Sequence, residues 1–169
     1  MNTNLKSIYH KVDLCVVGGG LAGMCAAVAA ARHGIKVALM HDRPVYGGNA
    51  SSEIRMWVCG AHGKNNRETG IIEEIALETL YRNPYRRYPM WDAILFELIN
   101  NEKNITPILN CSCNDIEMDG SKIKKVIGWQ TTTQCYHIIE AKLFADCSGD
   151  SILAPLSGAE YRWGRESRN

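Results

Sequence analysis

Apolar and polar residues form blocks of different length and period along the first 40 positions. Residues 12–17, VDLCVV, are a short valine-rich apolar run, as expected of a strand buried on both faces of a parallel sheet. A glycine cluster follows, and the small apolar residues 21–33 predict a helix that ends at Gly34. Residues 35–40, IKVALM, predict a second strand. Together they predict a right-handed strand, helix, strand crossover of about 30 residues.

Later blocks extend this pattern. Residues 67–81 and 91–100 carry apolar side chains near helical spacing with acids on the other side, which predicts two amphipathic helices lying on the sheet. Residues 105–110 predict a third parallel strand, and residues 113–118, 122–131 and 134–139 predict an antiparallel meander. Residues 142–147, KLFADC, return as a buried strand. The fold class is therefore α/β: a Rossmann-like parallel sheet flanked by helices, with a small antiparallel β meander.

The glycine cluster after the first strand has the spacing G-x-G-x-x-G. Gly18 permits a tight turn, Gly20 lets a pyrophosphate approach the backbone, and Gly23 lets the helix pack closely on the strand. Free N–H groups at the helix start, at Leu21 and Ala22, then face the anion. The alternative is a glycine-rich turn that holds no ligand. The position of the G-x-G-x-x-G motif between two apolar strands favours a dinucleotide site.

The end of the second strand is where a dinucleotide fold usually has an acid that binds the adenosine ribose. Counting from Gly18 puts His41 in that position, and Asp42 follows it. Either residue is a candidate for the ribose contact, and we favour Asp42. Arg43 is a candidate ligand for a 2′-phosphate, which would indicate NADP, or an exposed loop arginine.

Composition narrows the class of protein. At 169 residues, one domain is expected, and a net charge of +1 gives no basic field for nucleic acid or anionic lipid. Seven cysteines without a CxxC pair or zinc spacing indicate reduced thiols in a cytoplasmic protein without a metal site. Residues 14–31 are uncharged over a membrane-helix length, but four glycines would disrupt a helix there, so no membrane span is expected.

Residues 41–57, HDRPVYGGNASSEIRMW, resemble the segment after the second strand in FAD-dependent oxidoreductases with an N-terminal dinucleotide fold. The resemblance continues through RETGIIEEI at 67–75 and FADCSGDSILAPLSGAEYRWGRES at 144–167, so it covers nearly the whole chain. It implies that FAD is the cofactor rather than NAD, and that the GxGxxG unit holds its ADP half. It further implies cofactor contacts, in place of plain surface turns, at Gly47, Gly48, Asn49, Ser51, Ser52, Gly149 and Asp150.

Few groups are candidates for chemistry at the flavin ring. Arg55, Cys59 and His62 follow the second glycine-rich segment. A cationic Arg55 can stabilise reduced flavin or a substrate carboxylate, and His62 can move a proton near neutral pH. The alternatives are a salt bridge from Arg55 to Glu53, an inert thiol and a loop histidine. Cys111 and Cys113 are expected to act as small apolar residues, because disulfide geometry is poor at that spacing.

Three functions remain open. The first is the FAD-binding part of an oxidoreductase that moves a hydride between a small-molecule substrate and flavin. The second is a non-catalytic FAD- or NAD-binding module that acts with a partner chain, and the third is an α/β domain whose glycine loops are only structural. A dinucleotide fold with a substrate domain needs several hundred residues, so we expect residues 1–169 to be a single, incomplete FAD-binding domain. A homo-oligomer or a partner chain that completes the site stays open.

Overall fold

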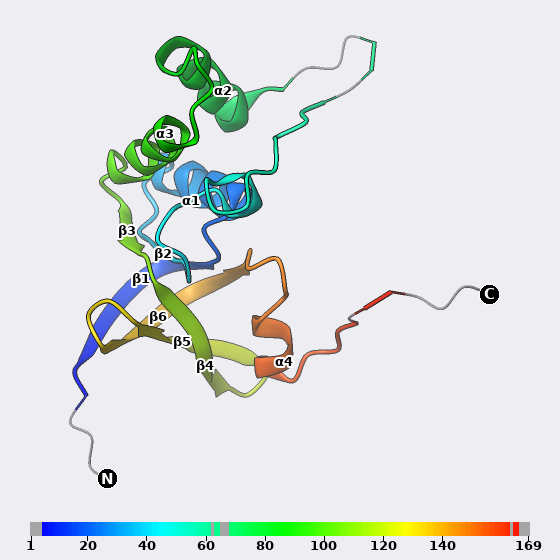
Figure 1. The fold of residues 1–169 in the computed structure, drawn as a ribbon. Coiled ribbons are helices and arrows are strands. Elements are labelled where there is room, and N and C mark those ends of the chain that lie inside the picture. Colours follow the sequence, from blue (N-terminus) through cyan, green and yellow to red (C-terminus); the bar gives the residue numbers. More distant parts are fainter. Residues whose placement is uncertain (1–4, 62, 65–67, 163, 166–169) are drawn as a thin grey trace.

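The computed structural model describes residues 5–61, 63–64, 68–162 and 164–165, and its central feature is one six-stranded sheet (Figure 1). The strand order is β3-β2-β1-β6-β5-β4. Strands β3, β2, β1 and β6 run parallel, and β5 and β4 run antiparallel to their neighbours. The elements are β1 (Ser7–Val17), α1 (Leu21–Arg32), β2 (Val37–Met40), the 3-10 turn η1 (Gly48–Ala50), α2 (Gly70–Arg82), α3 (Tyr88–Asn100), β3 (Ile105–Ile108), β4 (Cys111–Asp119), β5 (Lys122–Gln130), β6 (Cys135–Asp146) and α4 (Leu153–Ser157).

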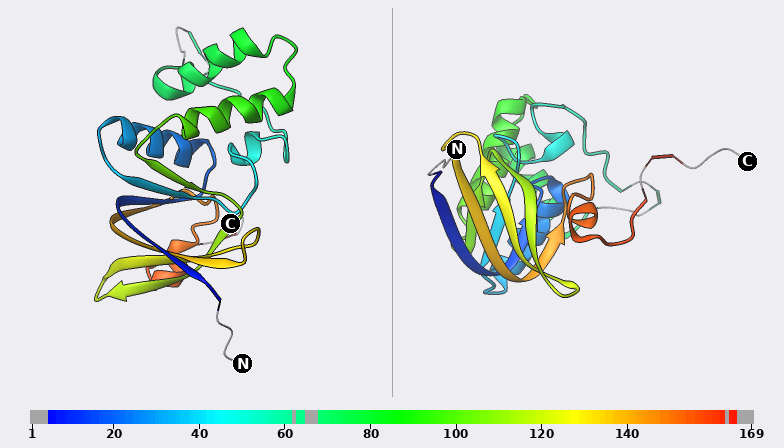
Figure 2. Two further views of the ribbon diagram at one scale, coloured as in Figure 1. Left: turned by 90° about the vertical axis from the view of Figure 1, so that its left-hand side faces the viewer. Right: turned by 90° about the horizontal axis from the view of Figure 1, so that it is seen from below.

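Both faces are covered at the end of β1 and along β2, which explains the continuous apolar runs there. Val16 and Leu39 face a core shared with α1 and α3, whereas Cys15 and Met40 face a second core shared with the meander and α4. Successive strand residues point to opposite faces, so a strand covered on both sides must be apolar at every position. Figure 2 shows the helices and the meander as separate layers on either side of β1 and β2. The predicted α/β class and the meander are therefore confirmed.

The closing strand differs from the prediction. Residues 134–139 and 142–147 were expected as two strands, but β6 is one strand from Cys135 to Asp146. In the sequence, the charged residues Glu140 and Lys142 suggest a break between two strands. In the structure they form ion pairs with β1. Glu140 lies 2.8 Å from Lys11, and Lys142 lies 2.6 Å from Asp13. The expectation that KLFADC is buried is also wrong, because the side chain of Leu143 is 69% exposed.

Other boundaries shift for local reasons. Strand β1 begins at Ser7 rather than at residue 12, because its first residues pair with β6 although they lack an apolar run. Helix α3 begins at Tyr88, with Pro89 in its first turn, where a proline is well tolerated. Strand β3 ends at Ile108, and Asn110 has a positive φ of 53° in the turn to β4. The short helix α4 was not expected.

The uncharged stretch at residues 14–31 does not form a single helix. It contains the end of β1, the glycine turn and most of α1, which has 12 residues. Among the residues that the structure describes, no helix has the length and apolar character needed to cross a membrane.

Candidate functional site

The first glycine loop joins β1 to α1, and its three motif glycines have different surroundings. Gly18 has a φ of 108°, and a Cβ there would lie 2.2 Å from the carbonyl oxygen of Cys147. A Cβ on Gly23 would lie 1.8 Å from the oxygen of Gly18. Both glycines are thus required by the packing of the protein itself, as expected for the tight turn and the close helix contact.

Gly20 is different, because nothing in the described structure crowds it. Its φ is −66°, and an added Cβ would meet only Gly48 Cα, at 4.0 Å. Gly20 is also the N-cap of α1, where no described side chain makes a capping hydrogen bond and the first turn has no acid. Leu21 and exposed Ala22 follow as the first residues of the helix. The open backbone and the uncapped helix end suit an anion supplied from outside.

The second glycine segment, residues 47–53, lies directly against the first glycine loop, although it is more than 20 residues away in sequence. Gly47 donates its N–H to the oxygen of Gly19 at 2.9 Å, and Gly20 and Gly47 form a parallel β-bridge. A Cβ on Gly48 would lie 3.1 Å from Gly20 Cα. Two backbone segments without side chains, half-buried at Gly20 and Gly48, therefore meet at the carboxyl end of β1.

Residues 49–52 follow this contact, and they differ in exposure and in hydrogen-bond partners. Asn49 is exposed, whereas Ser51 is fully buried and its hydroxyl accepts the N–H of Glu53 at 3.3 Å. Ser52 donates its N–H to Asp92 of α3 at 3.0 Å, which fixes the segment to the helical layer. Asp92 was predicted only as one of the acids on the polar side of its helix, and its contact with Ser52 is visible only in the structure. Asn49 and Ser52 are the polar members of this segment that remain accessible.

The two candidates at the end of β2 have separate roles in the structure. His41 is 4% exposed; its Nδ1 accepts the N–H of Gly19 at 3.0 Å, and its Nε2 lies 3.1 Å from the oxygen of Val45. Burial holds the pKa of His41 below its usual value. Asp42 is exposed, with 60% of its side chain in solvent. Of the two, Asp42 is the residue with free acceptor atoms for a ligand.

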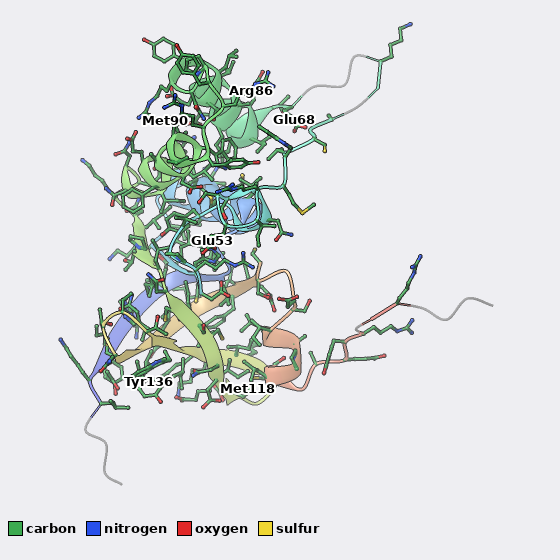
Figure 3. All side chains as sticks on the ribbon, viewed as in Figure 1. Glu53, Glu68, Arg86, Met90, Met118 and Tyr136 are labelled. Carbon is green, nitrogen blue, oxygen red and sulfur yellow. The ribbon has the colours of Figure 1, made fainter. Side chains whose placement is uncertain are left out.

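Arg43 has a partner within the protein. Its guanidinium lies 3.6 Å from the carboxylate of Glu53, in the second glycine segment. Figure 3 shows Glu53 between the helical layer and the meander. An arginine paired in this way is a poorer ligand for a 2′-phosphate, which favours the loop interpretation of Arg43.

A pocket of about 170 Å³ opens beside the first glycine loop, at the carboxyl ends of β1 and β2. Gly18 and Asp42 line one side, and Ser148 and Asp150 line another. Cys111 and Cys113 line the pocket from β4, and burial raises the pKa of these thiols to about 12 and about 11. Thiols with such pKa values stay protonated, in agreement with the prediction that these cysteines act as small apolar residues.

The turn after β6 forms part of the pocket wall. Asp146 accepts the N–H and the hydroxyl of Ser148 and the N–H of Leu153, the last at 2.7 Å, so its carboxylate fixes the turn. Gly149 has a φ of 85° and lies exposed at the tip, next to exposed Asp150. Because Gly18 packs on Cys147, this turn lies against the first glycine loop.

Two described residues, Arg55 and Cys59, were considered for chemistry at the flavin ring. Arg55 has a positive φ of 64°, its Nε donates to the oxygen of Ser52 at 2.9 Å, and its guanidinium lies 5.6 Å from the ring centre of Tyr88. Tyr88 donates its hydroxyl to the oxygen of Arg55 at 2.8 Å. The alternative salt bridge to Glu53 is wrong, because Glu53 pairs with Arg43. Cys59 is exposed, and His62 lies outside the described residues.

A family model described as FAD dependent oxidoreductase matches residues 13–169. The chain belongs to this family. The resemblance drawn from residues 41–57, 67–75 and 144–167 is therefore confirmed, and FAD is the cofactor of the family. Among curated proteins, the glycerol-3-phosphate dehydrogenase of Mycobacterium leprae is 35% identical over 69 residues, which are 41% of this chain and 12% of that enzyme. Glycerol-3-phosphate dehydrogenase 2 of Mycobacterium tuberculosis gives the same values.

Solved structures of FAD-dependent oxidoreductases and other enzymes share the fold. The glycerol-3-phosphate dehydrogenase from Bacillus halodurans, complexed with FAD, has a TM-score of 0.59 at 16% identity, over 87% of this chain and 36% of that one. L-proline dehydrogenase from P. horikoshii has a TM-score of 0.52 at 20% identity, over 85% and 23%. The FAD-dependent myxobacterial chondrochloren halogenase has a TM-score of 0.56 at 16% identity, over 84% and 38%. This chain thus spans less than half the length of the relatives and structures named here.

Proposed function

We propose that this chain holds the ADP half of FAD at the junction of its two glycine segments and forms the cofactor-binding part of an oxidoreductase. The observation that carries the proposal is the open backbone at Gly20, beside Gly48. Packing within the protein accounts for Gly18 and Gly23, but nothing within the described chain requires a glycine at position 20. A pyrophosphate that approaches the amino end of α1 supplies the missing reason.

The pocket beside this junction suits the adenosine. Asp42 offers carboxylate oxygens to the ribose hydroxyls, and the apolar atoms of Val17 and Met40 offer a surface for the adenine ring. Exposed Asn49 and half-buried Ser52, together with Asp150 in the pocket wall and its neighbour Gly149, are the next candidates for polar contacts. Ser51 contributes by shaping the turn, because its hydroxyl is fully buried.

Bound FAD supplies an acceptor for two electrons and a proton from a small organic substrate. Arg55 is the described cation nearest in sequence to the second glycine segment, and we propose that it stabilises negative charge on the substrate or the reduced cofactor. Its contact with Tyr88 holds the guanidinium in place at the start of α3. We extend the same proposal to His62, as a proton carrier, on its sequence position alone.

Substrate recognition is proposed to need a further part or a partner chain. Large apolar side chains at 54, 56, 57 and 58 are 42–64% exposed in the segment that leaves the site, and contiguous exposed apolar residues commonly mark a contact surface. Glycerol 3-phosphate and L-proline are the first substrates to test, because similar enzymes are dehydrogenases of these compounds.

All seven cysteines are unpaired, which supports a reducing compartment such as the cytoplasm.

The experiment is to add FAD to the purified chain and measure both flavin binding and the melting temperature. At a concentration of 100 times Kd, a ligand that binds only the folded state adds about 2.7 kcal/mol of stability, which raises Tm by roughly 5–10 °C for a chain of this size. ADP should compete with FAD, whereas FMN should not, because the proposed site holds the ADP half of the cofactor. Failure of saturating FAD to bind or to raise Tm would exclude this function.

A further inference from the structure

His41 occupies the position that usually holds the ribose-binding acid, but its side chain points to the protein. A backbone N–H only donates and a carbonyl oxygen only accepts, so Nδ1 must accept from Gly19 and Nε2 must carry the hydrogen that it donates to Val45. The ring is therefore neutral, with its hydrogen on Nε2. The two hydrogen bonds define both the charge and the tautomer of this side chain.

The ring also supports the first glycine loop by direct packing. A Cβ on Gly19 would lie 2.7 Å from Cγ of His41, so the loop backbone rests on the imidazole. The oxygen of Gly19 accepts the N–H of Gly47, which ties the second glycine segment to the first. His41 thus supports Gly19, and Gly19 in turn connects the first glycine loop to the second glycine segment.

Protonation of Nδ1 would break its hydrogen bond with Gly19. A hydrogen on Nδ1 faces the N–H of Gly19, and two donors cannot bond to one another. The carboxylate of Asp42 offers an alternative acceptor, because its Oδ1 lies 3.3 Å from Nδ1. Asp42 is also the residue available for the ribose, so a bond to protonated His41 takes it away from the ligand.

The surroundings of the ring fit a group that titrates. The charged groups that influence it are Asp42 and Arg43, which follow it in sequence, and Glu53 from the second glycine segment. Tyr46 lies nearly parallel to the imidazole, with ring centres 6.1 Å apart. From the neighbouring strands the contacts are backbone groups: the N–H of His41 donates to β3, and its oxygen accepts from the start of β4. Burial opposes protonation and the two carboxylates favour it.

We propose that His41 is a positioning residue that makes cofactor affinity depend on pH: when neutral it holds Gly19 in the cofactor-binding arrangement, and when protonated it releases Gly19 and captures Asp42. This inference rests on the proposed function, since it concerns the same site. One proton linked to binding weakens affinity by up to tenfold per pH unit below the pKa of the group. Because burial lowers the pKa of His41, we expect FAD affinity to fall by up to about tenfold between pH 7.5 and 5.5.

The test is a titration of the chain with FAD at pH 7.5 and pH 5.5, followed by flavin fluorescence. FAD is the appropriate probe because its pyrophosphate is a diester, whose charge is constant over this range. His41→Ala removes both hydrogen bonds and should weaken binding at pH 7.5. His41→Gln supplies one acceptor and one donor without titrating, so it should restore most of the lost affinity and flatten the pH profile. His33→Gln, at the exposed end of α1, is the matched control and should keep the wild-type profile.

A second measurement does not depend on binding. Nitrogen NMR of the cofactor-free chain should show His41 with an unprotonated Nδ1 at pH 7.5, and the amide of Gly19 should shift as His41 titrates. A wild-type pH profile in His41→Gln, or a wild-type affinity that is equal at both pH values, would overturn the proposal and leave the proposed function intact. Absence of FAD binding at every pH would instead overturn the proposed function, and a Gly19 amide that does not respond to pH would overturn the hydrogen-bond switch itself.

Discussion

Replacement of Gly20 or Gly23 by alanine separates cofactor binding from folding. An added methyl at position 20 meets nothing closer than 4.0 Å, and the φ of −66° suits alanine. Since alanine is a poorer N-cap than glycine, we expect Gly20→Ala to lower the free energy of unfolding by no more than about 1 kcal/mol. The methyl would occupy the approach to the amino end of α1. Loss of one charge-assisted hydrogen bond to the pyrophosphate is worth about 1.5–3 kcal/mol, or roughly 10- to 150-fold in the Kd for FAD.

Gly23→Ala, in contrast, should mainly lower the free energy of unfolding. Its methyl would lie 1.8 Å from the backbone oxygen of Gly18, which cannot withdraw without moving the end of β1. Overpacking of this kind costs about 3 kcal/mol or more in unfolding free energy. Urea denaturation measures stability and flavin fluorescence measures Kd for each variant. Gly34→Ala is the matched control: it has a φ of 83° in open space and should lose about 1 kcal/mol of stability while keeping the wild-type Kd. A Gly20→Ala protein that binds FAD as tightly as wild type would refute the assignment of the pyrophosphate to this loop.

Three further predictions concern stability and reactivity. Arg32→Ala removes three hydrogen bonds of 2.7 Å, two to Glu74 and one to Glu102, on the half-exposed surface, and should lower the unfolding free energy by about 1 kcal/mol, less in 1 M salt; an unchanged denaturation midpoint would contradict it. Burial lowers the pKa of His137, which is bonded to His10 at 2.9 Å, so folding stability should fall as pH drops below about 6.5, and His137→Gln should make the fall shallower in urea titrations. Cys59 is exposed whereas the other six cysteines are buried or half-buried, so mass spectrometry should find it alkylated first; earlier labelling elsewhere would contradict the described burial.

Local patterns were sufficient to predict the first half of the fold. The apolar runs at β1 and β2 and the glycine spacing predict a strand, a turn and a helix because each depends on neighbours in sequence. The same holds for α2 and α3, whose apolar positions repeat with the helical period. The resemblance at residues 41–57 then added the cofactor, which no single spacing specified.

Features that depend on distant partners were not predictable from these patterns. The spacing placed His41 at the end of β2, but the direction of its side chain depends on Gly19 and Val45. The continuity of β6 across Glu140 and Lys142 depends on its backbone pairing with β1, which is distant in sequence. The pairing of Arg43 with Glu53, in place of Arg55 with Glu53, depends on how the second glycine segment turns. In each case the sequence offers several partners of the right chemistry, and the tertiary fold selects one.

The contact between Gly18 and Cys147 has a consequence for the order of folding. Residues 12–40 encode the glycine loop and both strands beside it, yet the loop rests on the end of β6, which pairs with β1 across more than 120 residues of sequence. Contacts of such long range form late, because the entropy of closing the intervening chain opposes them. The loop that is encoded first is therefore completed last. A nascent chain that has emerged only as far as β5 has the glycine motif but not the wall against which it packs.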